Sequence, residues 1–127
     1  MIEKMIKFGT LFDFYGNLLS VRQYNVMEMF YLQDLSLSEI GIELNITRQG
    51  VYDNLKRAED NLNRYEDILG LVEKFKENHK DIEKILNIAK DINKIAITKN
   101  DIEILNKTKV IKDISFKILE NSWEVID

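Results

Sequence analysis

The chain has 127 residues, of which 45% are hydrophobic and 31% charged, a composition typical of a folded protein and not of a disordered one. It contains no proline and no cysteine, which excludes a disulfide framework and a thiolate metal site and favours long helices. The formal net charge is −4, and residues 1–70 carry it, with 7 basic against 11 acidic side chains. Because phosphate neutralisation provides most of the affinity for duplex DNA, this balance disfavours strong autonomous DNA binding.

The hydrophobic pattern predicts neither a membrane span nor an export signal. No apolar run approaches the roughly 20 residues that a spanning helix needs. Residues 1–7 lack the apolar stretch and the small-residue cleavage site of a secretory signal. We therefore expect a cytoplasmic protein.

Two helices are predicted before residue 35. Apolar residues form a broad face over residues 1 to about 15, and Gly16 is expected to end that helix in the left-handed conformation. Ser20 and Gln23 fit a capping box that opens a second helix, which runs to Gln33. The inner face of this second helix is expected to contain Val21, Tyr24, Met27, Phe30 and Tyr31.

Residues 35–57 have the pattern of a helix-turn-helix. Ser36 and Glu39 fit a capping box at the start of a short helix, and Asn45 tolerates the left-handed backbone of a tight turn. Thr47 is the expected N-cap of the second helix, and Gly41 lies where the two helices would cross. The residues expected to be buried are Leu37, Ile40, Leu44, Ile46, Val51 and Leu55. Two ordinary packed helices without a nucleic-acid role remain the alternative.

The second helix of this motif is expected to continue to about Leu69, with Gly70 as its C-terminal cap, so residues 1–70 would form one domain. Residues 71–127 then form a helical hairpin or extension. Residues Thr98–Asp101 fit a third capping box between its two helices, and Trp123 either anchors the tail or lies loose. The first of these helices has an amphipathic stripe of Leu71, Phe75, Ile82, Ile85, Leu86, Ala89, Ile92 and Ala96. This stripe could fold back on the first domain or pair with a second copy, as a homodimer.

The residues give no sign of an enzyme, a cofactor or a metal site. No glycine-rich phosphate loop follows a strand, and the single histidine, His79, has no context of a catalytic triad. The carboxylate pairs Glu59–Asp60 and Glu66–Asp67 point in diverging directions on a helix, so we interpret them as solvated surface.

The candidate nucleic-acid-binding residues lie at the start of the second motif helix, the part that faces the major groove in a docked helix-turn-helix. Arginine suits guanine, glutamine suits adenine, and lysine or arginine can hold flanking phosphates. The candidates are Thr47, Arg48, Gln49, Tyr52, Lys56 and Arg57. The alternative is that the basic members only balance Asp53, Glu59 and Asp60 on a solvated face, unless Asp53 pairs with Arg57.

Three runs of sequence, Leu11–Leu19, Tyr31–Ile40 and Thr47–Glu59, resemble the YlxM family. These are small bacterial helix-turn-helix proteins similar to region 4 of sigma factors. The resemblance implies an all-α fold, with an N-terminal domain like sigma region 4 and a long-helix C-terminal extension. It also implies an accessory or regulatory role in the signal recognition particle pathway, with the particle's RNA and its targeting GTPase as partners. A DNA-binding transcriptional regulator and a purely structural interaction module are the alternatives.

Overall fold

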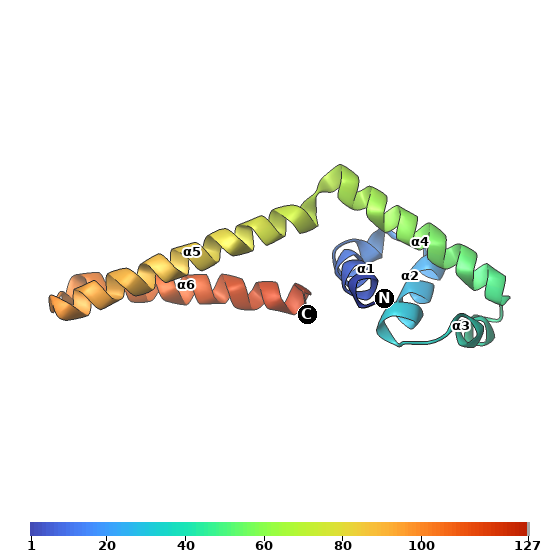
Figure 1. Cartoon of the computed structure of the whole chain (residues 1–127), viewed down its shortest axis with the longest axis horizontal. Coiled ribbons are helices and arrows are strands. Elements are labelled where there is room, and N and C mark those ends of the chain that lie inside the picture. The colour runs from blue at the N-terminus through green and yellow to red at the C-terminus, as the bar shows by residue number, and fades with distance from the viewer. Residues whose placement is uncertain (127) are drawn as a thin grey trace. The chain divides into compact units, whose positions relative to one another are not determined.

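The computed structural model describes residues 1–126, and it describes the side-chain surroundings of residues 1–120. Residues 1–126 form helices and turns without a strand, which confirms the predicted all-α fold (Figure 1). The chain divides into two compact units, one of them Met1–Val72 and the other from Glu73 onward. No helix in the described part of the chain has the length and apolarity needed to cross a membrane.

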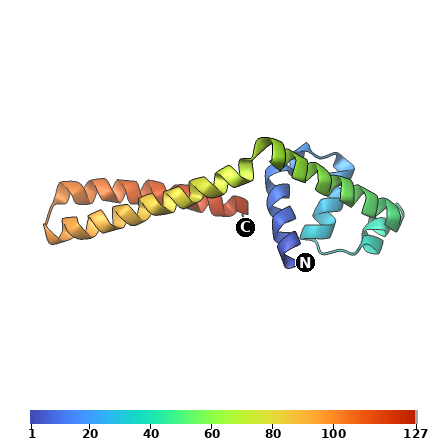
Figure 2. The ribbon, with the colours of Figure 1, turned by 45° about the horizontal axis from the view of Figure 1, so that its top comes forward.

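The first unit consists of short helices packed against one long one. Its elements are α1 (Ile2–Tyr15), the 3₁₀ turn η1 (Gly16–Leu18), α2 (Val21–Met27), the π-helical turn η2 (Glu28–Leu32), α3 (Leu37–Leu44) and α4 (Arg48–Leu69). The long helix α4 packs against α1, α2 and α3, and both views of the ribbon show it running across them (Figures 1 and 2). As predicted, α4 ends at Leu69, and Gly70 takes the left-handed conformation with φ +61°.

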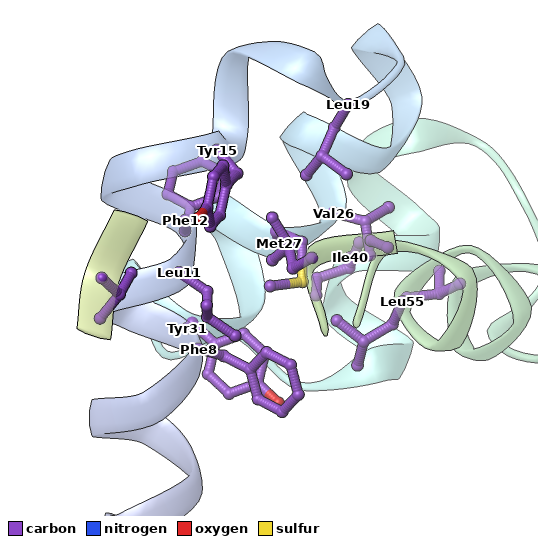
Figure 3. Close-up of a cluster of buried hydrophobic side chains, with 14 residues drawn as sticks. Phe8, Leu11, Phe12, Tyr15, Leu19, Val26, Met27, Tyr31, Ile40 and Leu55 are labelled. Atoms are coloured by element: carbon purple, nitrogen blue, oxygen red, sulfur yellow. The ribbon is translucent and has the colours of Figure 1, made fainter. Parts of the chain in front are cut away.

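The core of this unit is aromatic on the side of α1 and aliphatic on the side of α3 (Figure 3). The ring centroids of Phe8 and Tyr31 lie 5.6 Å apart, and those of Phe12 and Tyr24 lie 4.7 Å apart. Aromatic pairs at these separations add to the hydrophobic gain from burial. The largest fully buried side chains are Tyr15, Val26, Met27, Ile40, Val51 and Leu62.

The connection after α1 differs from the prediction. Gly16 is right-handed, with φ −53°, so the expected left-handed cap is wrong. The reason is that the chain continues directly into η1, where the Leu19 N–H donates to the Gly16 carbonyl, and no reversal is needed at residue 16. Ser20 is the N-cap of α2, as expected, because its hydroxyl accepts from the Gln23 N–H at 3.2 Å. Gln23 does not complete the predicted capping box, because its Oε1 accepts from Asn61 Nδ2 at 3.2 Å.

The predicted helix from Val21 to Gln33 is also interrupted. It changes at Glu28 into the wider π turn, where the Gln33 N–H donates to the Glu28 carbonyl five residues back. Val21, expected on the inner face, is 79% exposed, whereas Val26 is fully buried. Val21 is the first residue of α2, and on this side of the unit Leu19 and Val26 fill the core in its place.

The second unit is a hairpin of two long helices, α5 (Leu71–Thr98) and α6 (Ile102–Ile126), which lie side by side and antiparallel in both views (Figures 1 and 2). The reversal occurs at Asn100, with φ +55°. Asp101 caps α6, since its carboxylate accepts from the Ile104 N–H at 3.2 Å. The expected cap, Thr98, is wrong because its hydroxyl donates to the Lys94 carbonyl within α5.

The interior of the hairpin contains smaller and more polar side chains than the sequence predicted. Asn93 Nδ2 donates to the Thr108 hydroxyl at 3.1 Å across the two helices. The buried residues are Leu86, Ala89 and Ala96 on α5 and Thr108, Ser115 and Leu119 on α6. The predicted stripe on α5 is confirmed at Leu86, Ala89 and Ala96. It is wrong at Leu71, Ile85 and Ile92, which are exposed. Trp123 lies outside the residues whose side chains are described.

Candidate helix-turn-helix interface

The first helix of the motif, α3, begins with the predicted capping box. The Glu39 N–H donates to the Ser36 hydroxyl, and the Ser36 N–H donates to the Glu39 carboxylate, both at 3.1 Å. Hydrogen bonding to the Ser36 backbone lowers the pKa of Glu39 below its usual range. Two amides that the start of the helix would otherwise leave unpaired are thus satisfied.

The turn between α3 and α4 matches the predicted geometry. Asn45 is left-handed, with φ +56° and ψ +46°, and the following Ile46 N–H donates to the Gly41 carbonyl at 2.9 Å. A Cβ atom at Gly41 would lie 2.8 Å from the Ile46 carbonyl oxygen, closer than van der Waals contact allows. Position 41 therefore needs a glycine for this close approach of the backbone.

The second helix, α4, begins at the predicted cap. The Thr47 hydroxyl accepts from the Gly50 N–H at 2.9 Å. Ile40 and Val51 are fully buried and Leu55 is nearly so, as expected. Leu37, Leu44 and Ile46, which the sequence also placed inside, are only partly buried and pack against the edge of the core.

All six candidate binding residues lie on the exposed surface, and Tyr52 exposes 48% of its area. Gln49, Tyr52 and Lys56 follow one another at steps of three and four residues, so they share one face of α4. Arg48 occupies the first helical position, and Arg57 lies beside Lys56. The structure thus presents these side chains outward from the N-terminal half of α4.

The charged neighbours leave the basic candidates accessible. Over residues 1–120, no ion pair joins Arg48, Lys56 or Arg57 to a carboxylate. Asp53 instead accepts a hydrogen bond from the Gln49 side-chain amide, Nε2 to Oδ1, at 3.0 Å. The anticipated pairing of Asp53 with Arg57 is therefore not formed, and the amide of Gln49 is partly engaged.

Glu59 corrects the interpretation of the acidic pairs as solvated surface, because it is only 4% exposed. The Tyr31 hydroxyl donates to Glu59 Oε2 at 2.9 Å, and Lys4 Nζ lies 3.3 Å from the same oxygen. Burial and the neighbouring carboxylate raise the pKa of Tyr31 well above its ordinary value. This cluster joins α4 to α1 and η2, whereas Asp60 remains exposed.

Glu66, from the second acidic pair, is likewise engaged in the fold. Its Oε1 accepts from the Tyr15 hydroxyl and from the Val72 N–H, the latter at 3.0 Å. The Leu71 N–H donates to the Tyr15 oxygen at 3.1 Å, and burial raises the pKa of the Tyr15 phenol. These bonds fix the end of α4 and the first turn of α5, and Asp67 stays exposed.

Metal ligation has no support in the described residues. No three His, Asp or Glu side chains gather there as a metal site would require. His79 Nδ1 lies 3.5 Å from a carboxylate oxygen of Glu83, one turn further along α5. This contact is an ordinary neighbour pair on a helix.

Comparisons with known protein sequences match this chain to one family. The sequence model of the UPF0122 family, described as "Putative helix-turn-helix protein, YlxM / p13 like", matches residues 2–104. A UPF0122 protein of Acetivibrio thermocellus is 40% identical over 119 residues, which cover 94% of this chain and 97% of that protein. Relatives in Desulforamulus reducens (49% over 87 residues, 68% and 74% covered) and Caldanaerobacter subterraneus (60% over 75 residues, 59% and 64% covered) bear the same family name. No solved structure matches the chain.

Proposed function

This chain belongs to the UPF0122 family of helix-turn-helix proteins, and we propose that it is a non-enzymatic accessory protein that binds the signal recognition particle through its helix-turn-helix face. The family match confirms the resemblance to YlxM. The particle enters the proposal through that resemblance, which implies the particle's RNA, its targeting GTPase or both as the partner. The face consists of Thr47, Arg48, Gln49, Tyr52, Lys56 and Arg57.

The observation that carries the proposal is the set of exposed cations on the N-terminal half of α4, which no carboxylate neutralises within residues 1–120. The N-terminus of a 22-residue helix adds a positive partial charge and amides that point outward. Arg48 lies at that terminus, and Lys56 and Arg57 follow two turns later. Together they can contact successive phosphates of a nucleic acid.

Tyr52 supports a structured RNA as the nucleic acid. Proteins recognise unpaired RNA bases largely by stacking them on aromatic rings, and Tyr52 exposes almost half of its surface between Arg48 and Lys56. The net charge of −4 over residues 1–70 opposes binding to long duplex DNA, where affinity depends on many phosphate contacts. Exposed carboxylates near the face, such as Asp60, are compatible with a basic protein partner in the same particle.

The test compares binding of the purified chain to the particle's RNA, to its GTPase and to duplex DNA, all at the same salt concentration. The variant Arg48→Ala, Lys56→Ala, Arg57→Ala removes the cations of the face. The matched control, Lys84→Ala, Lys94→Ala, Lys117→Ala, removes three exposed cations of the hairpin. We expect the first variant to lose about tenfold or more in affinity for the RNA or the GTPase, and the control to lose little. Binding of the wild type to neither component, or equal losses in both variants, would refute the proposal.

A DNA-binding transcriptional regulator is the second candidate, and the position of Arg48 and Gln49 at the helix start favours it. These are positions from which a docked helix reads base edges. Selection from genomic fragments would then enrich one site, and Arg48→Ala with Gln49→Ala would abolish its binding. The hydrogen bond from Gln49 to Asp53 argues against this candidate, because it occupies the amide that would read adenine.

A further inference from the structure

Beside the residues that face each other across α5 and α6, which we name the seam, the hairpin has a second apolar surface that is not buried. The seam on α5 contains Leu86, Ala89, Asn93 and Ala96, which follow one another at steps of three and four residues. Each of these positions is preceded by an isoleucine that exposes between 39% and 58% of its surface. The four isoleucines are Ile85, Ile88, Ile92 and Ile95. One residue corresponds to a rotation of about 100°, so they form a stripe beside the seam.

The second helix repeats this arrangement. Its seam contains Leu105, Thr108, Lys112, Ser115 and Leu119. The isoleucines that precede four of these positions are between 40% and 54% exposed. They are Ile104, Ile111, Ile114 and Ile118.

The two stripes lie on the same side of the hairpin. Because α5 and α6 are antiparallel, an offset of one residue before the seam on each helix rotates both stripes toward one face. Positions one residue after the seam must then face the other way. Lys90 and Phe116, which follow Ala89 and Ser115, meet there, with Lys90 Nζ 5.5 Å from the ring centroid. The eight isoleucines therefore form one surface, which we name the isoleucine face.

The isoleucine face is large enough to be an interface. Its eight isoleucines each expose between 39% and 58% of their surface. Together they form an apolar patch on the order of the largest that an ordinary monomer exposes, about 300–600 Å², which is comparable to the roughly 800 Å² that each partner contributes to a standard interface. Covering this surface lowers the free energy of the protein, because the hydrophobic gain is proportional to the apolar area removed from water.

The order of residues along the face indicates which partner covers it. On α5 the four isoleucines of the stripe are spaced symmetrically about residue 90. The same helical spacing continues to Asp81 before Ile85 and to Lys99 after Ile95. On α6, Ile104 and Ile118 are spaced symmetrically about Ile111, whereas Ile114 has no symmetry mate on the stripe, since the equivalent position falls on the buried Thr108, next to Lys107. The Asn93–Thr108 hydrogen bond sets residues 90 and 111 at the same height along the hairpin, three residues from each bonded partner. Both stripes thus share one centre.

We propose that the isoleucine face binds a second copy of this chain and forms an antiparallel four-helix bundle. A two-fold axis through the shared centre brings the isoleucine face of one copy into contact with the same face of the other copy, and the two hairpin loops then lie at opposite ends of the bundle. Ile85 then meets Ile95 of the other copy, Ile88 meets Ile92, and the two Ile111 side chains meet on the axis. The same rotation brings Asp81 of each copy to Lys99 of the other, so the ends of the interface are complementary in charge. This dimer is independent of what the helix-turn-helix binds.

The first test measures the mass of the full chain by analytical ultracentrifugation at micromolar concentration. We expect twice the mass of one chain for the wild type, and the mass of one chain for Ile88→Lys with Ile114→Lys. The matched control is Ile97→Lys with Ile102→Lys, at positions that are 61% and 68% exposed but lie off the face, and it should remain dimeric. Circular dichroism checks that each variant keeps its helices. A monomeric wild type, or a dimer that the face variant leaves intact, would overturn the proposal.

The second test fixes the arrangement by cross-linking, which is simple because the natural chain has no cysteine. Ile111→Cys places one thiol per copy on the axis, within the reach of a disulfide. Ile104→Cys places its two thiols about 21 Å apart, a separation of 14 helical residues, so they cannot join. We expect oxidation to link the first variant into dimers and to leave the second unlinked. The reverse pattern, or equal linking of both, would contradict the two-fold axis at Ile111.

Discussion

Removing the Tyr31 hydroxyl tests how α4 is held in place. In Tyr31→Phe the ring still packs against Phe8, but the nearly buried Glu59 carboxylate retains only its contact with Lys4. Hydrogen bonds to charged groups contribute about 1.5–3 kcal/mol, and the loss of one leaves a buried acceptor unsatisfied. For a unit of this size, 1 kcal/mol corresponds to about 4–8 °C in Tm, so the fall should be at least about 6 °C.

The assay is thermal and urea unfolding followed by tyrosine circular dichroism, which reports mainly on the first unit. The control Tyr52→Phe changes an exposed ring and should remain within about 0.5 kcal/mol of the wild type. The double variant Tyr31→Phe, Glu59→Met removes both partners and should be at least as stable as Tyr31→Phe alone. A cost below about 0.5 kcal/mol for the single variant, or additive costs in the double variant, would refute the assignment of Glu59 as a buried acceptor.

Three further predictions concern the same unit. The pKa of Tyr31 is higher in the folded chain than its ordinary value of 10.0. The stabilisation by the protonated phenol is therefore complete below pH 10.0 and is lost as the pH rises through the folded-state pKa. Urea midpoints should fall at alkaline pH, and they should fall less steeply in Tyr31→Phe. Gly41→Val should destabilise by about 1–3 kcal/mol in urea unfolding, because a Cβ there meets the Ile46 carbonyl; an unchanged midpoint would show that the turn is looser than described. Asn45→Val should cost about 1–2 kcal/mol at φ +56°, whereas Asn45→Gly should not, and equal costs would argue against a left-handed turn.

The local features of the helix-turn-helix were predictable from the sequence, because each depends on residues within one turn of one another. Two kinds of local signal carry these predictions: the Ser36–Glu39 box and the Thr47 cap follow from side chains that bond to nearby backbone, and the left-handed Asn45 and Gly70 follow from residue types that tolerate positive φ. The outward direction of the binding candidates followed in the same way, from helical periodicity.

The features that the sequence did not reveal depend on partners far along the chain. In the sequence Glu59 has the pattern of an exposed acidic residue. In the fold η2 places Tyr31, 28 residues earlier in the chain, within hydrogen-bond distance of the Glu59 carboxylate. The π turn itself has no clear sequence signal. In the hairpin, hydrophobicity alone put Ile85 and Ile92 in one stripe with Ala89, whereas close packing of the two helices buries Ala89 and the polar Thr108 and Ser115 and leaves both isoleucines exposed.

Within the candidate site, the orientation of residues was predictable but their pairing was not. Asp53 has Gln49 one turn before it and Arg57 one turn after it, and both are suitable partners at helical spacing. The structure selects Gln49 and leaves Arg57 available. This choice weakens direct base reading by Gln49 and keeps the cations of the face accessible, which favours phosphate contact over sequence recognition.

The most direct test of the account is the affinity of the full chain for the signal recognition particle RNA and GTPase, measured side by side with duplex DNA at one salt concentration. We expect binding to at least one of the two components, loss of that binding in Arg48→Ala with Tyr52→Ala, and weaker binding to the duplex. Binding to neither component, or binding that this variant leaves unchanged, would contradict a functional helix-turn-helix face.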